Sequence, residues 1–116
     1  MRSWLIALVV AGCGGVDRNI EDQITIDQGV YGLLIAGCDT SGCHDQPAAN
    51  EAVVVYVPGS DDETVTSDND GVYEFHLPAG DYTLCTSSCT HVTVPSGLIR
   101  YDWTSGPGGG RWAPQQ

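Results

Sequence analysis

The amino-acid sequence predicts an all-β fold, a single antiparallel β-sandwich, from three observations. No segment shows the 3.6-residue apolar period of an amphipathic helix. β-branched and aromatic residues form short runs that Gly, Pro, Asn and Asp interrupt at regular intervals, which is typical of sandwich strands and their turns. Within residues 72–77 apolar and polar side chains alternate, which predicts a half-buried strand with its aromatic side inward.

Seven segments bounded by turn residues are expected to form the strands. Ala52–Val57 is apolar on both faces, so we expect it to be a central strand that ends at Pro58-Gly59. The expected strands are Val30–Gly37, Ala52–Val57, Thr64–Ser67, Val72–Leu77, Tyr82–Cys85, His91–Val94 and Leu98–Trp103. The side chains expected to point inward are Tyr73, Phe75, Leu77, Val92, Val94, Ile99, Tyr101 and Trp103.

The first residues of the chain have the order of a bacterial export signal. Arg2 supplies a positive charge, and the apolar run Trp4–Ala11 follows it, with about half of the ~20 residues that a membrane-spanning helix needs. The sequence Val-Ala-Gly-Cys at positions 10–13 is similar to a lipobox. The resemblance implies that residues 1–12 are a signal peptide, that Cys13 is acylated on its sulfur and on the new amino terminus, and that several chains anchor the protein stably.

The same resemblance predicts where the protein is found and how the chain is organised. Gly14 follows the cysteine, whereas an Asp there is associated with inner-membrane retention, so we expect a lipid-anchored protein of the bacterial cell envelope, in the outer membrane. The polar residues 13–28 are expected to be a lipidated tether, with a short strand at residues 24–26. The sandwich would occupy residues 29–103, and the Gly/Pro-rich residues 104–116 are expected to be a flexible tail.

The charge of the chain excludes nucleic acid as a partner. Four arginines and no lysine face fifteen acidic residues, which gives a formal net charge of −11, and loss of Arg2 with the signal peptide would bring it to −12. Such a surface repels phosphate backbones. We attribute the acidity to the solubility of an exposed domain, with attraction of cations or basic partners as the alternative.

Four cysteines remain for the folded domain: Cys38, Cys43, Cys85 and Cys89. An even number in an exported chain indicates two disulfides, for which three connectivities are possible. Local pairing would close two short loops worth roughly 2 kcal/mol each, whereas cross pairing would close rings worth roughly 4 kcal/mol. We favour local pairing because short loops close sooner, but the spacing leaves the connectivity open.

Residues 64–84 carry a motif of a known domain family. A threonine-containing strand, an Asp-x-Asp-Gly turn, an alternating aromatic strand, a Pro-x-Gly turn and Tyr-x-Leu follow one another. The segment resembles the carboxypeptidase regulatory-like domain, a seven-strand, prealbumin (transthyretin)-like sandwich similar to adhesin B-type repeats, over residues 29–103. The matching residues are Thr66, Asp68, Asp70, Gly71, Tyr73, Phe75, Leu77, Pro78, Gly80, Tyr82 and Leu84.

The chain departs from this family at two loops, and each departure adds cysteines. Residues 38–44, Cys-Asp-Thr-Ser-Gly-Cys-His, are inserted between the first two strands, and Cys85–Cys89 replaces a loop that usually carries a glycine and an aromatic residue. Loops stapled by disulfides suit a small domain outside the cell. Tyr82 lies where a tyrosine corner would bind nearby backbone.

Haem and zinc are two possible ligands of the cysteine loops. The spacing from Cys38 to Cys43-His44 resembles a variant haem-attachment site, with His76 or His91 as the distal ligand. The four cysteines with His44 or His91 would offer zinc ligands, but their spacing is uncommon and the compartment oxidises thiols. We favour a disulfide loop with an incidental histidine and expect no cofactor.

Calcium is a third possibility, at the acidic turns. Asp68 and Asp70 resemble half of an EF-hand loop, and residues 61–63 form a second acidic group. The distal glutamate of an EF-hand is missing, and the turn alone explains Asp68 and Asp70. We therefore expect no metal site here.

The sequence also favours a non-catalytic function. It has no nucleophile elbow, zinc-protease helix or phosphate loop, and in carboxypeptidases the similar domain is the non-catalytic companion of the enzyme. We expect a membrane-anchored envelope lipoprotein that binds or scaffolds a protein or carbohydrate partner, with Trp103 and Trp112 considered for sugar stacking. The alternatives are a purely structural envelope lipoprotein and a small metal- or haem-carrying redox protein that uses the Cys38/Cys43/His44 loop.

Overall fold

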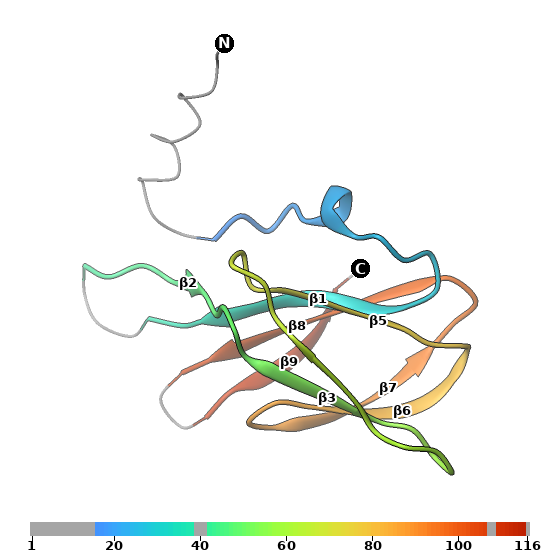
Figure 1. Ribbon diagram of the computed structural model, residues 1–116. Coiled ribbons are helices and arrows are strands. Elements are labelled where there is room, and N and C mark those ends of the chain that lie inside the picture. The colour runs from blue at the N-terminus through green and yellow to red at the C-terminus, as the bar shows by residue number, and fades with distance from the viewer. Residues whose placement is uncertain (1–15, 39–41, 107–108, 116) are drawn as a thin grey trace.

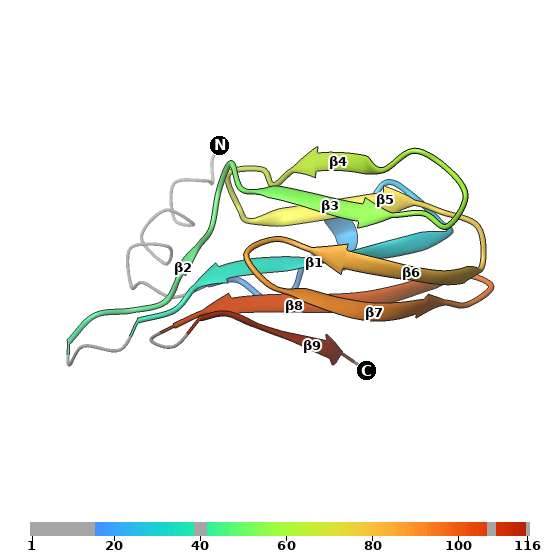
Figure 2. The same cartoon turned by 90° about the horizontal axis from the view of Figure 1, so that it is seen from below.

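Within residues 16–38, 42–106 and 109–115, which the computed structural model describes, nine strands form two sheets packed face to face (Figures 1 and 2). Sheet A has the strand order β2-β1-β8-β9, with β5 also paired to β1, and sheet B has the order β4-β3-β6-β7. The strands are β1 (Gly29–Ala36), β2 (Gln46–Pro47), β3 (Ala52–Tyr56), β4 (Glu63–Thr66), β5 (Val72–His76), β6 (Gly80–Cys85), β7 (Cys89–Val94), β8 (Leu98–Ser105) and β9 (Arg111–Gln115). The all-β sandwich is therefore confirmed; seven of these strands overlap the expected ones, and β2 and β9 are additional.

The core between the sheets follows the predicted alternation. Tyr73, Phe75 and Leu77 of the alternating segment are each 2% exposed. Val92, Val94 and Trp103 are also buried in this cluster, and Ile99 and Tyr101 pack against it. β3 is flanked by β4 and β6, as expected of a central strand, but its outward residues Ala52 and Tyr56 are exposed because nothing in the described chain covers sheet B.

One strand pair departs from the antiparallel expectation. β1 and β8 pair in parallel, from Gly29 opposite Leu98 to Ala36 opposite Ser105. The β7–β8 turn delivers β8 beside the start of β1, where the Gly29 amide donates to the Gly97 carbonyl at 3.0 Å. The side chain of Gln28 holds this corner, since it accepts from the Gly97 amide at 2.8 Å and donates to the carbonyl oxygens of Pro95 and Leu77.

The segment of residues 16–28, here called the strap, lies across the outer face of sheet A (blue in Figure 1). It contains a short 3-10 helix, η1 (Glu21–Gln23), and a fully buried Ile20. Ile20 joins a second apolar cluster on this face, which also contains Tyr31, Leu33, Ile35 and Val72. β1 is consequently buried on both faces, because the core covers one and the strap the other.

The strap corrects two expectations. Residues 16–28 are packed chain instead of a tether, because the apolar side chains of β1 that face outward need cover. Residues 24–26 form no strand; Thr25 is held instead by Glu74 of β5, to which both its amide and its hydroxyl donate. The lipidation candidate Cys13 and the expected signal peptide, residues 1–12, lie outside the described residues.

The expectation of a flexible tail after residue 103 is also wrong. β8 continues to Ser105, and β9 pairs antiparallel with it. The ring of Trp112 packs edge-on against Tyr73, with centroids 6.1 Å apart, and its Nε1 donates to the Ser88 carbonyl at 2.8 Å. β8 and β9 thus form a hairpin, and Trp112 is half-buried against the core cluster.

Tyr82 forms the predicted tyrosine corner, and its hydroxyl donates to the Pro78 carbonyl at 2.7 Å. Tyr82→Phe removes this bond without changing the shape of the ring, so we expect the free energy of unfolding to fall by about 1 kcal/mol. Urea denaturation followed by tryptophan fluorescence measures the change. Tyr56→Phe, at a 45% exposed tyrosine, is the matched control and should leave stability unaltered; an equally unaltered curve for Tyr82→Phe would contradict the corner.

Candidate functional site

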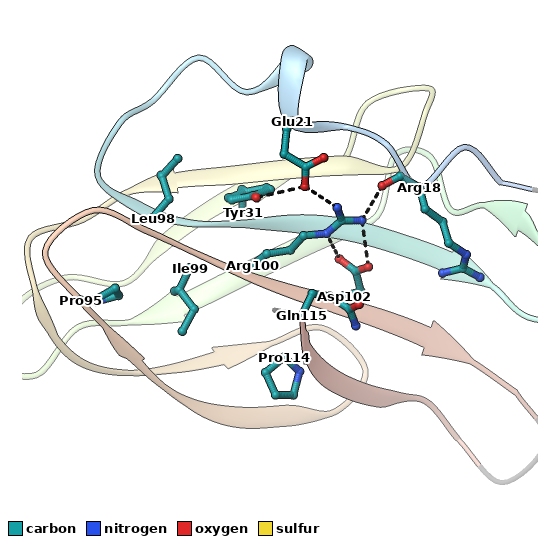
Figure 3. Close-up of a pocket in the computed structure, with 10 residues that line it drawn as sticks. All are labelled: Arg18, Glu21, Tyr31, Pro95, Leu98, Ile99, Arg100, Asp102, Pro114 and Gln115. Carbon is teal, nitrogen blue, oxygen red and sulfur yellow. Dashed lines mark hydrogen bonds and ion pairs between the residues drawn. The ribbon is translucent and has the colours of Figure 1, made fainter.

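A pocket lies on the outer face of sheet A, between the strap and the start of β8 (Figure 3). Its volume is about 510 Å³, within the range of small-molecule pockets. One wall is apolar and the other carries ionic groups that point toward one another. The lining residues are Arg18, Glu21, Tyr31, Pro95, Leu98, Ile99, Arg100, Asp102, Pro114 and Gln115.

The Arg100 guanidinium is the centre of the ionic wall. It forms a bidentate pair with Asp102, Nε to Oδ1 at 3.0 Å and Nη2 to Oδ2 at 3.1 Å. It also reaches the strap, where Nη1 donates to Glu21 Oε2 at 2.7 Å and Nη2 donates to the Arg18 carbonyl at 2.9 Å. Its side chain is only 12% exposed. Arg100 thus clamps the strap onto sheet A.

Asp102 fills a gap in the β1–β8 ladder. The register pairs residues 29–31 with 98–100 and residues 34–36 with 103–105, but not the residues between them. There the Leu33 amide donates to Asp102 Oδ1 at 3.0 Å, and the Tyr101 carbonyl accepts from the Tyr73 hydroxyl at 2.7 Å. These side chains satisfy backbone groups that would otherwise be buried without partners.

The charges of this cluster are fixed by their contacts. The hydrogen bond from Arg100 lowers the pKa of Glu21, which keeps this carboxylate ionised. Burial lowers the pKa of Arg100, but the hydrogen bonds and charges of Asp102 and Glu21 outweigh it and raise the pKa overall. Burial and the charge of Glu21 raise the pKa of Tyr31, so the phenol remains neutral and donates to Glu21 Oε2 at 3.3 Å. The carboxylates of Glu21 and Asp102 are thus both paired with the Arg100 guanidinium.

Glu21→Gln is expected to destabilise the protein at neutral pH but not in acid. The pKa of Glu21 in the folded protein is below its usual value of 4.5 because Arg100 pairs with the ionised carboxylate. The stabilisation of the folded protein by this pair is therefore complete above pH 4.5 and is lost as the pH falls through the folded-state pKa. The difference in unfolding free energy between wild type and variant should therefore vanish at low pH. Urea titrations on both sides of this pKa measure it, with exposed Glu63→Gln as control; a difference that persists in acid would contradict the bridge.

A second, smaller groove of about 260 Å³ lies on the outer face of sheet B. Tyr56, Thr83 and His91 form a cross-strand row over β3, β6 and β7, since Tyr56 is opposite Thr83 and Thr83 is opposite His91. Asp81 accepts from Thr93 Oγ1 at 2.8 Å and lies 3.6 Å from His91 Nε2. Tyr56 was not among the candidate residues; its strand is apolar on both faces, so the sequence pattern did not show that Tyr56 faces solvent.

The four cysteines of the domain occur in local pairs. Cys38 is bonded to Cys43, with Cα atoms 6.0 Å apart, and Cys85 to Cys89, with Cα atoms 4.0 Å apart. Both loops lie at the same end of the sandwich, together with the β4–β5 turn (Figure 2). This arrangement places His44 next to a disulfide.

The other candidate ligands are separate from one another. Asp68 Oδ1 accepts from the amides of Asp70 and Val72 at 2.9 and 3.0 Å, which is the turn chemistry expected of this motif. His91 faces Asp81 on sheet B, far along the chain from His44. Within the residues that the structure describes, no three His, Cys, Asp or Glu side chains are gathered as a metal site.

The tryptophans considered for sugar stacking pack against one another, and Trp103 is buried whereas Trp112 is half-buried. Trp103 is 5% exposed and its Nε1 donates to Ser88 Oγ at 3.0 Å. Trp112 packs against Trp103 at a centroid distance of 6.5 Å. In the groove on sheet B, Tyr56 is the aromatic residue exposed to solvent, at 45%.

Comparison with known protein families and curated proteins found no relative of this chain. No protein-family model matches the chain, and no curated protein matches it significantly. In the described part of the chain no helix has the length and apolar character needed to cross a membrane. The fold therefore defines the chain as an all-β sandwich, and its function is inferred from its residues alone.

Proposed function

We propose that this protein is a non-catalytic, lipid-anchored lipoprotein of the bacterial cell envelope, in the outer membrane, whose sandwich binds a protein or carbohydrate partner. The observation that carries the proposal is the lipobox-like run that ends at Cys13, three residues before Val16, where the described chain starts. A lipid-anchored chain of this kind consists of an anchor and a folded module. The module here is a sandwich with two disulfide-bonded loops, which suits an oxidising compartment.

The outer face of sheet B supports the binding part of the proposal. The strap covers the opposite face of the sandwich, whereas this one is exposed and carries the ring of Tyr56 beside Thr83, His91 and Asp81. An aromatic ring next to hydroxyl, imidazole and carboxylate groups suits a sugar ring or a polar peptide, because it combines stacking with hydrogen bonding. We therefore place the binding surface on this face.

The Arg100 network supports the non-catalytic part. Each of its charged groups already pairs within the network, and Asp102 additionally holds the Leu33 amide of β1. A reacting group needs a free position for a substrate atom, and these groups hold the strap and the β1–β8 pair instead. The network is the best-formed ionic cluster of the described chain, and its contacts have a structural purpose.

The anchor is tested with Cys13→Ser. Cells that express the wild-type protein should incorporate radiolabelled palmitate into it and retain it in the membrane fraction, whereas the variant should lose the label and the attachment. Cys13→Ala is the matched second variant. A wild-type protein without label that retains residues 1–12 would overturn the lipoprotein assignment.

The partner is tested with a photo-cross-linking amino acid at position 56, in the native envelope. Adducts of defined mass at Tyr56, absent when the same amino acid replaces exposed Asp22 on the strap, would identify a protein or glycan on sheet B. No adduct at position 56 would favour the purely structural alternative. A Soret band, with haem bound covalently to Cys38 and Cys43 through thioether bonds in place of their disulfide, would favour the haem-carrying alternative.

A further inference from the structure

We infer that the end of the sandwich where the strap begins is held against the phospholipid headgroups, so that the opposite end, with the β3–β4 loop, points away from the membrane. The inference rests on the proposed lipidation of Cys13 and specifies a surface that this proposal leaves open. Three observations carry it: the length of chain before the strap, the fixation of the strap on sheet A, and the place where the strap begins.

The first observation is the short connection. Three peptide units join Cys13 to Val16, and when fully extended they span at most about 11 Å. The described domain is 47 Å long in its largest dimension. A lipid on Cys13 therefore holds the domain within contact distance of the bilayer surface. The connection is also too short for the domain to turn over and bring its opposite end to the bilayer.

The second observation is that the strap does not provide additional length. Ile20 is fully buried against β1, and Arg100 bonds both the Glu21 carboxylate and the Arg18 carbonyl. Thr25 is bonded to Glu74 further along. Detachment of the strap from sheet A would expose the outer apolar face of β1 and would leave Arg100 without its strap partners.

The third observation is the position of the first strap residues. Arg18 Nη2 lies 3.9 Å from Asp45 Oδ2, and Asp45 Oδ1 accepts from the Cys38 amide at 2.9 Å. The strap thus begins beside β2 and the Cys38–Cys43 loop, and the β3–β4 loop that contains Ser60 lies at the opposite end in both views (Figures 1 and 2). The end beside Gln46 is the one that faces the headgroups.

The test uses the full-length lipidated protein in native outer-membrane vesicles, with a benzophenone amino acid at Gln46 or at Ser60, both of which are exposed. After irradiation we expect phospholipid adducts at position 46, detected by mass spectrometry, and none at position 60. Insertion of a flexible Gly-Ser segment of about 20 residues after Cys13, which adds roughly 25 Å of average reach, should abolish the adducts at position 46.

The outcomes separate this inference from the lipoprotein proposal. The acylation of Cys13 is measured in the same sample by mass spectrometry. An acylated protein that forms no lipid adduct at position 46, or equal adducts at positions 46 and 60, would overturn the orientation and leave the lipoprotein proposal intact. An unacylated protein would overturn both. Adducts at position 46 that survive the Gly-Ser insertion would show that the short connection does not set the orientation.

Discussion

Arg100→Leu is expected to lower the free energy of unfolding by about 3–5 kcal/mol. The substitution removes the bidentate partner of Asp102, whose side chain is 6% exposed, and leaves a buried carboxylate without its counter-charge. It also removes the two bonds from the guanidinium to the strap. We expect the loss to appear in urea denaturation and as faster hydrogen exchange of the amides in the strap and β1.

Two further variants make this prediction specific. Arg18→Gln changes an arginine that is 58% exposed and lies 3.9 Å from Asp45, so it should cost less than about 1 kcal/mol. Asp102→Asn in the Arg100→Leu background removes the unpaired charge and retains an acceptor for the Leu33 amide, so it should restore part of the lost stability. If Arg100→Leu costs no more than Arg18→Gln, the clamp is not a stabilising element.

Gly32→Ala is expected to cost about 3 kcal/mol, because β1 and β8 approach each other too closely for a side chain at this position. A Cβ atom on Gly32 would lie 1.7 Å from the Tyr101 carbonyl oxygen and 2.7 Å from its carbonyl carbon. Both are backbone atoms of β8 and are unable to rotate away. The strands would have to separate, which would weaken the bond from the Tyr73 hydroxyl to Tyr101 and that from the Leu33 amide to Asp102.

Gly106→Ala is the matched control for this substitution. The nearest atom to a Cβ on Gly106 is the Gly109 carbonyl oxygen at 4.0 Å, so the change should leave the melting temperature nearly unaltered. Thermal unfolding followed by circular dichroism compares the two variants. A Gly32→Ala protein as stable as the control would contradict the close approach of β1 and β8. A Gly32→Ala protein that fails to fold would show a loss of stability larger than the expected one, in the same direction.

The two predictions concern the same part of the molecule, the β1–β8 pair beneath the strap. Gly32 permits the close approach of β1 and β8. Asp102 accepts the hydrogen bond of the Leu33 amide, which has no partner in the β1–β8 ladder. Arg100 neutralises the charge of Asp102 and binds the strap through Glu21. If Cys13 is lipidated as proposed, the strap in turn limits how far the domain can lie from the bilayer. The stability of the pair and the proposed orientation at the membrane are therefore linked through Arg100.

Local patterns were sufficient for seven of the nine strands of the described chain and for the Asp68–Gly71 turn. Alternation placed Tyr73 and Phe75 inward, the Asp68–Gly71 turn formed as its residues required, and Tyr82 bonds Pro78 four residues away. These features depend on residues close together in the chain, so their physical cause is present in any short window of the sequence.

The sequence by itself determined that this chain forms two sheets of short strands around one apolar core. Only the tertiary structure decided the parallel β1–β8 pair, the packed strap and the hairpin of β9. Arg100 meets Glu21 across 79 positions of the chain, and Asp102 meets the Leu33 amide across 69. Neither a charge nor a glycine-rich run specifies such a distant partner, because the partner is fixed only when folding brings both ends of the chain onto the same face of a sheet.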